Sequence, residues 1–224
     1  MASRYAAVVF AGVDRLPDGR RCGYWLPEAA YPWQALVSAG WTVVSVSTVA
    51  APPRPGGVDR TDRTQRTFLD DPAAQRALAG TRRVECYEPA DFGAVVFTGG
   101  AGAAVDLPAD CALARFTHAV LTGGGVVAAT GYGVAALLAV AALDPPALRT
   151  RELTCPSPEE ERALGVAAPD GRWLADDLAR HGALVRHGPP FRPHVVAGPV
   201  ITGQNPASAP VLARHLISAT ARLS

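Results

Sequence analysis

Residues 123–143, GGGVVAATGYGVAALLAVAAL, restrict the fold of this chain more than any other segment. Residues 126–130 form a short apolar run typical of a buried strand, and residues 134–143 are apolar on every side of a helix. A turn at Gly131 joins the two. Because both parts must be covered by other elements, we expect this unit at the centre of a parallel sheet.

Short apolar runs alternate with longer amphipathic segments in the rest of the chain, which favours a parallel sheet with helices on both faces. We predict strands at residues 5–12, 41–48, 93–98, 126–130, near 152–155, and at 194–197 and 199–202. We predict helices at 27–39, 70–79, 108–121, 134–143, around 159, at 173–181 and in a last segment ending at 223. Residues 49–67, rich in Pro, Gly and Arg, are expected to form a long loop. With 224 residues, 49% hydrophobic content and no visible linker, we expect one domain over residues 1–224.

Composition excludes several function classes. All 21 basic residues counted as Lys or Arg are Arg, so a Schiff-base lysine and a Walker-type phosphate loop are both excluded. The net charge is +1 and no run of like charges occurs, so no nucleic-acid partner is expected. The N-terminal apolar stretch is too short for a signal peptide or a membrane span, so we expect a cytoplasmic protein without a membrane partner.

Cysteine and histidine spacing gives no sign of a metal site. The four cysteines lie far apart without a CxxC pair, which fits neither a zinc ribbon nor a disulfide scaffold. No histidine has a second ligand at the spacing that a metal site needs; they are His118, His181, His187, His194 and His215. We therefore predict no metal and no cofactor.

Four segments follow one another along nearly the whole chain: GYWLPEAAYPWQAL, VVFTGGAGAAVDLP, TCPSPEEERALG and PHVVAGPVITGQNPASA. In this order they resemble the ThiJ/PfpI superfamily of the class I glutamine amidotransferase-like fold, in particular its glyoxalase III and chaperone branch. The resemblance implies a flavodoxin-like, doubly wound and mostly parallel sheet with helices on both faces. It also implies a homodimer, and a glutamate, Glu28, that points at the active site.

The strand-to-helix turn departs from the family pattern. There the family has a cysteine nucleophile followed by a histidine, whereas this chain has Gly131 followed by Tyr132. After the two glycines of the oxyanion loop, where the glyoxalase branch has a histidine, this chain has Ala101. Because glycine cannot form a covalent intermediate, we predict no glutaminase, protease or glyoxalase activity.

The residues that remain suit acid/base chemistry on a small molecule, and a secondary metabolite is the expected substrate class. Loss of the nucleophile is expected to leave a cavity faced by Glu28 as general acid or base, with its pKa raised by partial burial. Tyr132 is expected beside it as a phenol donor. The expected substrate-binding residues are Gly99, Gly100, Ala101, Thr130 and Gly131, with the glycine N–H groups binding a carbonyl or an oxyanion. Lyase, hydratase, cyclase and epoxide-opening hydrolase reactions all fit this set.

Two glutamates and two cysteines near the expected site are predicted to have structural roles. Glu159 and Glu160 match the region where the family places the acidic residue that orients its histidine. Without that histidine, we expect them to be a solvated acidic start of a helix. Cys155 and Cys22 are expected to be small apolar fillers near the site.

Two alternatives stay open. Gly131, Gly133 and Ala136 match G-x-G-x-x-A between a strand and a helix, with Glu152 about 20 residues further on, which is the pattern of a dinucleotide-binding protein. The second alternative is a non-catalytic dimer with a chaperone or sensing role.

Overall fold

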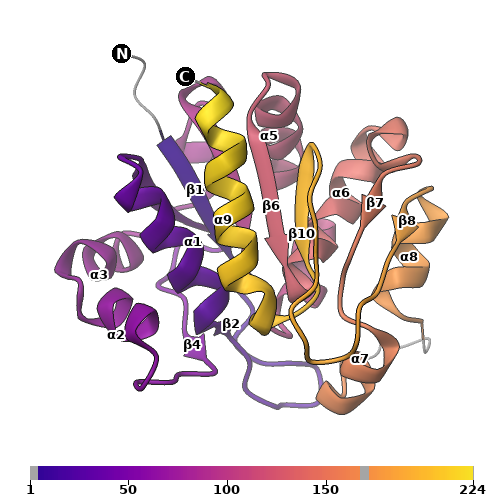
Figure 1. Cartoon of the computed structure of the whole chain (residues 1–224), viewed down its shortest axis with the longest axis horizontal. Coiled ribbons are helices and arrows are strands. Elements are labelled where there is room, and N and C mark those ends of the chain that lie inside the picture. The colour runs from indigo at the N-terminus through magenta and orange to yellow at the C-terminus, as the bar shows by residue number, and fades with distance from the viewer. Residues whose placement is uncertain (1–4, 167–171, 224) are drawn as a thin grey trace.

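The computed structural model describes residues 5–166 and 172–223. Their main sheet has six strands in the order β3-β1-β5-β6-β10-β9 (Figure 1). The strands are β1 (Tyr5–Phe10), β3 (Thr42–Ser47), β5 (Phe92–Phe97), β6 (Val126–Thr130), β9 (Val195–Val196) and β10 (Val200–Gly203). All neighbours pair in parallel except β9, which is antiparallel to β10. The doubly wound, mostly parallel sheet is confirmed, with β6 between β5 and β10.

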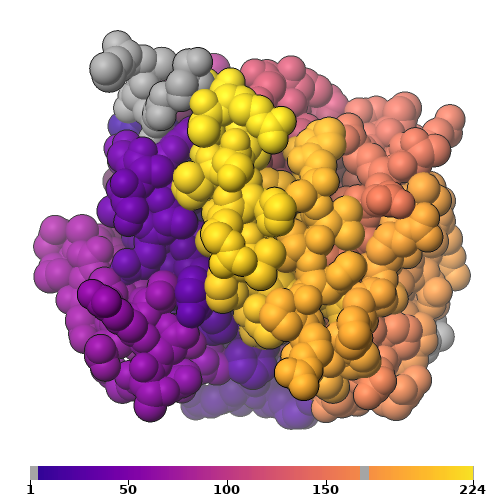
Figure 2. Space-filling view, viewed as in Figure 1, coloured from indigo at the N-terminus to yellow at the C-terminus, as the bar shows by residue number. Residues whose placement is uncertain are grey.

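Two apolar cores cover the two faces of this sheet. On β1, Ala7 and Val9 belong to one core, and Ala6, Val8 and Phe10 belong to the other, as the two-residue period of a strand requires. The first core is closed by α5 (Cys111–Thr122), α6 (Ala136–Leu143) and α8 (Leu174–Arg180). The second is closed by α1 (Leu26–Ser38), α2 (Arg63–Asp70), α3 (Pro72–Ala79) and α9 (Ala209–Thr220). On that face α9 lies beside α1 (Figure 2).

The expected long loop over residues 49–67 is shorter than predicted. It contains β4 (Pro55–Gly56), which pairs with β2 (Tyr24–Trp25), and it ends where α2 begins at Arg63. The Asp62 side chain accepts a hydrogen bond from the Gln65 N–H at 2.9 Å and caps this helix. The helix predicted at 70–79 is therefore the second of two, because Asp71 caps α3 separately.

Two other helices begin later than expected. The helix predicted from residue 108 begins at Cys111, because the Asp110 side chain accepts hydrogen bonds from the N–H groups of Ala112 and Leu113. It is preceded by α4 (Ala103–Asp106). The helix predicted from residue 134 is α-helical only from Ala136, since Gly131–Ala135 form a 3₁₀ helix, η4. The tighter turn lets the chain leave β6 sharply.

The tail forms its own small sheet. The strand predicted near residue 152 is β7 (Glu152–Leu153), and it pairs in parallel with β8 (Leu184–Val185), a strand that the sequence analysis did not include. α7 (Pro158–Leu164) lies between them in the chain, together with α8. Among the residues described, no helix combines the length and the apolar character that crossing a bilayer demands.

Candidate functional site

The turn after β6 holds a glycine in a conformation that other residues rarely adopt. Gly131 has φ +55° and is buried, directly after Thr130 ends the strand. A side chain in this left-handed region costs about 1–2 kcal/mol relative to glycine. The sharp turn expected at residue 131 is therefore present, with a glycine where the family resemblance places the nucleophile.

Glu28 approaches this turn from the first turn of α1. Its side chain is 1% exposed, and Oε2 accepts a hydrogen bond from the Gly99 N–H at 2.6 Å. Oε1 is buried without a hydrogen-bond partner. Desolvation raises the pKa of Glu28 to about 8, against the lowering effect of the Gly99 N–H. At neutral pH this carboxyl is therefore mainly protonated, with one oxygen free to act as a donor.

The cavity that we expected at Glu28 is filled by its own carboxyl. A Cβ placed on Gly131 would lie 2.7 Å from Glu28 Oε1, and one on Gly99 would lie 2.3 Å from Oε2. The absence of both Cβ atoms lets the carboxyl pack against the backbone of the turn and of the glycine loop. Glu28 is brought together with Gly99 and Gly131 as predicted, but in a closed arrangement.

The backbone of the glycine loop after β5 is in contact with other parts of the protein and is not free for a substrate. Its Gly99 N–H already binds Glu28, so this donor is not open to a substrate oxyanion. Gly100 has φ +119°, and a Cβ there would lie 1.9 Å from the Gly23 carbonyl oxygen. Ala101 lines a cavity of about 420 Å³ together with Gly23, Trp25 and Tyr132. Glu28 is not among its lining residues, so this cavity borders the loop without opening onto the carboxyl.

Thr130 lies at the end of β6 and is fully buried. Its Oγ1 has no hydrogen-bond partner. It adjoins Gly131 in the chain, and its backbone oxygen lies near Gly99, since a Cβ on Gly99 would be 2.7 Å from it. Thr130 thus belongs to the closed group around Glu28.

Tyr132 does not direct its phenol at Glu28. The side chain is 3% exposed and belongs to the core on the α5–α6 face. Burial raises the pKa of this phenol, and the charged groups that add to the effect are Glu161, Cys155 and Glu160. Its hydroxyl is buried with no hydrogen bond of normal geometry. The expected side-chain pair of Glu28 and Tyr132 is therefore replaced by a neighbourhood of Tyr132 and Glu161.

Glu161, on α7, is a residue that the sequence analysis did not single out. It is 2% exposed, and its Oε1 accepts a hydrogen bond from the Leu174 N–H at 3.0 Å. Desolvation raises the pKa of Glu161 to about 7, helped by the charges of Asp176 and Asp177. The signal in the sequence was the run of three glutamates at 159–161, which alone cannot say which of the three faces inward.

Glu160 is not a solvated residue at the start of a helix, as we had expected. It is 2% exposed, and its oxygens accept four hydrogen bonds from N–H groups of Ser157, Phe191, Gln204 and Asn205 at 2.7–2.9 Å. Desolvation opposes ionisation, but these donors outweigh it and lower the pKa. The carboxylate thus joins α7 to the loop after β10, and of the three glutamates only Glu159 fits the expectation of a solvated side chain.

Of the two cysteines near the site, Cys155 is buried and Cys22 is half-buried. Cys155 is fully buried, its Sγ lies 3.8 Å from His187 Nε2, and burial raises the pKa of its thiol. Cys22 donates to the Val13 carbonyl oxygen at 3.3 Å, and desolvation raises its pKa as well. Raised thiol pKa values disfavour the nucleophilic thiolate, which agrees with the role of fillers.

The turn at Gly131 offers little to a dinucleotide. Gly131, Tyr132 and Gly133 are buried, and a Cβ on Gly133 would lie 2.6 Å from the Phe97 carbonyl oxygen. Gly133 therefore serves the packing of η4 against β5. Glu152 is exposed and forms an ion pair with Arg186 at 3.1 Å. These contacts speak against a pyrophosphate site at this turn.

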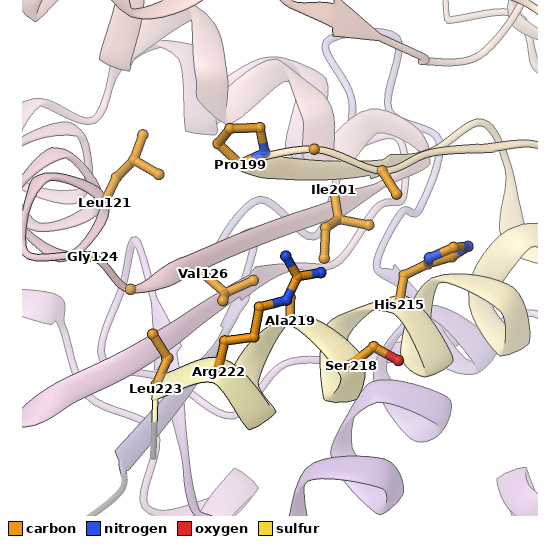
Figure 3. Close-up of a pocket in the computed structure, with 13 residues that line it drawn as sticks. Leu121, Gly124, Val126, Pro199, Ile201, His215, Ser218, Ala219, Arg222 and Leu223 are labelled. Atoms are coloured by element: carbon orange, nitrogen blue, oxygen red, sulfur yellow. The ribbon is translucent and has the colours of Figure 1, made fainter.

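A separate groove of about 590 Å³ lies at the other end of β6 (Figure 3). It is lined by Val126 at the start of the strand, by Pro199 and Ile201, and by His215 and Arg222 near the C-terminus. Figure 3 shows the Arg222 side chain reaching across this groove. The groove is remote along β6 from the turn at Gly131 and does not contribute to the site.

Comparison with known proteins gives one family. A family model described as the DJ-1/PfpI family matches residues 24–219. No curated protein matches the chain. Among solved structures, Rapid Encystment Protein 24 KDa of Francisella tularensis superposes with a TM-score of 0.88 at 23% identity, covering 97% of this chain and 99% of that one. Glyoxalase III from Candida albicans gives 0.85 at 20% identity, covering 97% and 98%. A ThiJ/PfpI domain protein from Brachyspira murdochii gives 0.65 at 17%, covering 100% and 99%.

Proposed function

This chain belongs to the DJ-1/PfpI family, and we propose that it is a cysteine-independent, cofactor-free acid/base enzyme for a small organic substrate of the secondary-metabolite type. Glu28 is the proposed proton donor and acceptor. The reaction classes that this chemistry serves are those of a lyase, hydratase, cyclase or epoxide-opening hydrolase. Glutaminase, protease and glyoxalase reactions are not proposed, because they need a nucleophile that Gly131 cannot supply.

The observation that supports this proposal is the state of the Glu28 carboxyl. Burial keeps it neutral, with a pKa of about 8, and its Oε1 is buried next to Gly131 without a partner. General acids work best with a pKa near the operating pH. A carboxyl that is held neutral and lacks a partner on one oxygen has the properties of such an acid.

In the proposed reaction, the Glu28 side chain turns away from Gly131 toward a substrate that enters beside Gly23 and Ala101. For an epoxide, Glu28 gives its proton to the ring oxygen as the C–O bond breaks, and water forms the new C–O bond. The Glu28 carboxylate then takes the surplus proton from that water. The products are a diol and the original neutral carboxyl, so protons and atoms balance.

The test is a screen of epoxides, enones and hydroxyketones by mass spectrometry, with wild type, Glu28→Gln and, as a control, Glu159→Gln. For any compound turned over, we expect Glu28→Gln to lower kcat by roughly 100-fold or more, since general acid catalysis contributes about that much. The Glu159 control changes an exposed glutamate and should behave as wild type. Equal turnover by wild type and Glu28→Gln would overturn the proposal.

One observation favours a second candidate, a non-catalytic member with a chaperone or sensing role, which the family resemblance would place in a homodimer. Glu28 is 1% exposed, so a substrate reaches it only after a local rearrangement. In that case, no compound is turned over and Glu28→Gln affects stability alone. Light scattering of a heat-aggregating client protein, with and without the chain, would test the chaperone role.

A further inference from the structure

A cavity of about 530 Å³ is lined by residues of α4, α6, α7 and α8 and by Tyr132 of η4, which it shares with the cavity beside Ala101. Pockets for small organic ligands have volumes of roughly 300–1,000 Å³ and mostly apolar walls. This cavity meets both criteria, because its volume lies within that range and most of its lining residues are apolar. They include Leu16, Pro17, Val105, Leu138, Val166 and Leu174.

The two arginines at this cavity are already paired with carboxylates. The Arg20 side chain binds Asp18 at 2.6 Å and donates to two carbonyl oxygens of residues 164–165. Arg172 forms an ion pair with Asp177 at 3.0 Å. Each cation at the cavity thus has an acidic neighbour, and the site has no evident preference for a charged ligand.

Two buried polar side chains line the same cavity. The Tyr132 hydroxyl is buried without a hydrogen bond of normal geometry, and it interacts with Glu161, one oxygen of which is held by the Leu174 N–H. Leaving a buried hydroxyl unpaired is unfavourable, so a ligand oxygen that pairs with it would recover free energy. A neutral Glu161 can donate to the phenol oxygen and leave the phenol proton for the ligand.

We propose that this cavity binds a neutral, largely apolar organic molecule that carries a ketone-type oxygen. The Tyr132 hydroxyl donates a hydrogen bond to that oxygen, and Glu161 acts as a positioning residue for the phenol. The inference goes beyond the proposed function, because Glu28 does not line this cavity. Binding is tested apart from turnover, so failure of one does not imply failure of the other.

The probe for this site is 1-tetralone, with tetralin as the matched molecule that lacks the oxygen. Binding to the full chain would be measured by saturation-transfer NMR and calorimetry. We expect wild type to bind tetralone roughly 3- to 10-fold more tightly than tetralin, as one hydrogen bond allows. In Tyr132→Phe this ratio should fall to about 1 while tetralin binding is unchanged. An unaltered ratio in Tyr132→Phe, or no binding of either molecule to folded wild type, would overturn the proposal.

A variant that fills the cavity tests whether tetralone and tetralin bind there. Val105 lines the cavity and is 44% exposed, so Val105→Trp can fill it without disturbing the core. We expect this variant to lose binding of both molecules. The matched control is Val37→Trp, at a helix residue that is 46% exposed and lies outside this lining, which should bind as wild type does. Equal binding by the two variants would contradict the assignment.

The role of Glu161 is tested by pH. The groups that face its carboxyl are Tyr132 from η4, the Cys155 thiol, the Leu174 N–H, and Asp176 and Asp177 from α8. Neutral Glu161 frees the phenol proton, so wild type should prefer tetralone more strongly at pH 6 than at pH 8. In Glu161→Gln the preference should no longer change with pH. A retained pH dependence in that variant would rule out the positioning role.

Discussion

Glu28 and Glu161 are both buried carboxyls with raised pKa values, but a small molecule meets them differently. Glu28 is closed in by glycine backbone and has Gly99 as its hydrogen-bond donor. Glu161 lines a cavity of about 530 Å³ next to an unpaired phenol. A buried carboxyl with few hydrogen-bond donors stays neutral. Where such a carboxyl also lies beside a cavity, a ligand can contact it. The first region suits proton transfer after a rearrangement, and the second suits binding in the structure as it stands.

Glu160 extends this comparison. It is as deeply buried as Glu161, but its pKa is lowered and not raised. Four N–H donors lower its pKa, whereas Glu161 has one backbone donor and two aspartates nearby. Adjacent residues on one helix are therefore ionised to different extents. What decides the charge of a buried carboxyl here is the count of donors around it.

The largest effect is expected at Glu160. In Glu160→Gln an amide group faces N–H donors, so we expect the free energy of unfolding to fall by about 3–5 kcal/mol. Glu161→Gln should change it by about 1 kcal/mol or less at pH 7, where desolvation already opposes the charge. Urea unfolding of both variants checks this pair. Similar losses in the two would show that the donors do not distinguish them.

The next effect is the pH dependence of stability due to Glu28. Its pKa is raised from 4.5 to about 8, so the folded state binds a proton that the unfolded state has released in this range. Stability is complete below about pH 4.5 and declines as pH rises through the folded pKa, by up to about 1.4 kcal/mol per pH unit. From pH 6 to pH 8, wild type should lose about 2–3 kcal/mol more than Glu28→Gln. Parallel urea-unfolding results for the two proteins would contradict the raised pKa.

The effect expected at Gly131 is of similar size. Gly131→Ala should destabilise the fold by about 2–3 kcal/mol, since it adds the cost of positive φ to a contact with Glu28 Oε1. Gly40→Ala is the matched control, because Gly40 has φ +82° and open space around its Cβ position. It should cost only about 1–2 kcal/mol. Thermal unfolding of both variants measures the difference, and equal losses would mean that the Glu28 carboxyl moves aside freely.

Tyr132 gives the smallest effect. Its hydroxyl has no partner, so Tyr132→Phe should leave the free energy of unfolding unchanged or raise it by less than about 1 kcal/mol. In contrast, the Tyr31 hydroxyl donates to Asp62 at 2.7 Å, and Tyr31→Phe should lower it by about 1–2 kcal/mol. Chemical unfolding compares the two. A clear loss in Tyr132→Phe would show that Glu161 already satisfies the phenol in the free protein.

Much of the fold was predictable from local patterns. The strand at Val126–Thr130 and the apolar helix after it had the expected bounds or nearly so, because apolar runs and helix periods are local properties. The helix that begins at Arg63 was not predicted, and the one that begins at Cys111 was predicted to begin too early, although Asp62 and Asp110 are typical caps. Of the candidate site, the contact of Glu28 with Gly99 and Gly131 was predicted through the family resemblance. The tight packing of the Glu28 carboxyl against both glycines was not predicted. It depends on Gly99 and Gly131 facing the same carboxyl, which only the fold determines.

The sequence by itself determined the doubly wound sheet, the glycine at the turn after β6 and the lack of a nucleophile there. These follow from the order of residues along the chain, through period, turn preference and side-chain chemistry. Only the tertiary structure decided that Tyr132 faces Glu161 and not Glu28, and that the pKa of Glu160 is lowered while that of its neighbour Glu161 is raised. The reason is that desolvation and hydrogen bonding depend on groups from segments that are distant in the sequence. Only the folded chain brings these groups together.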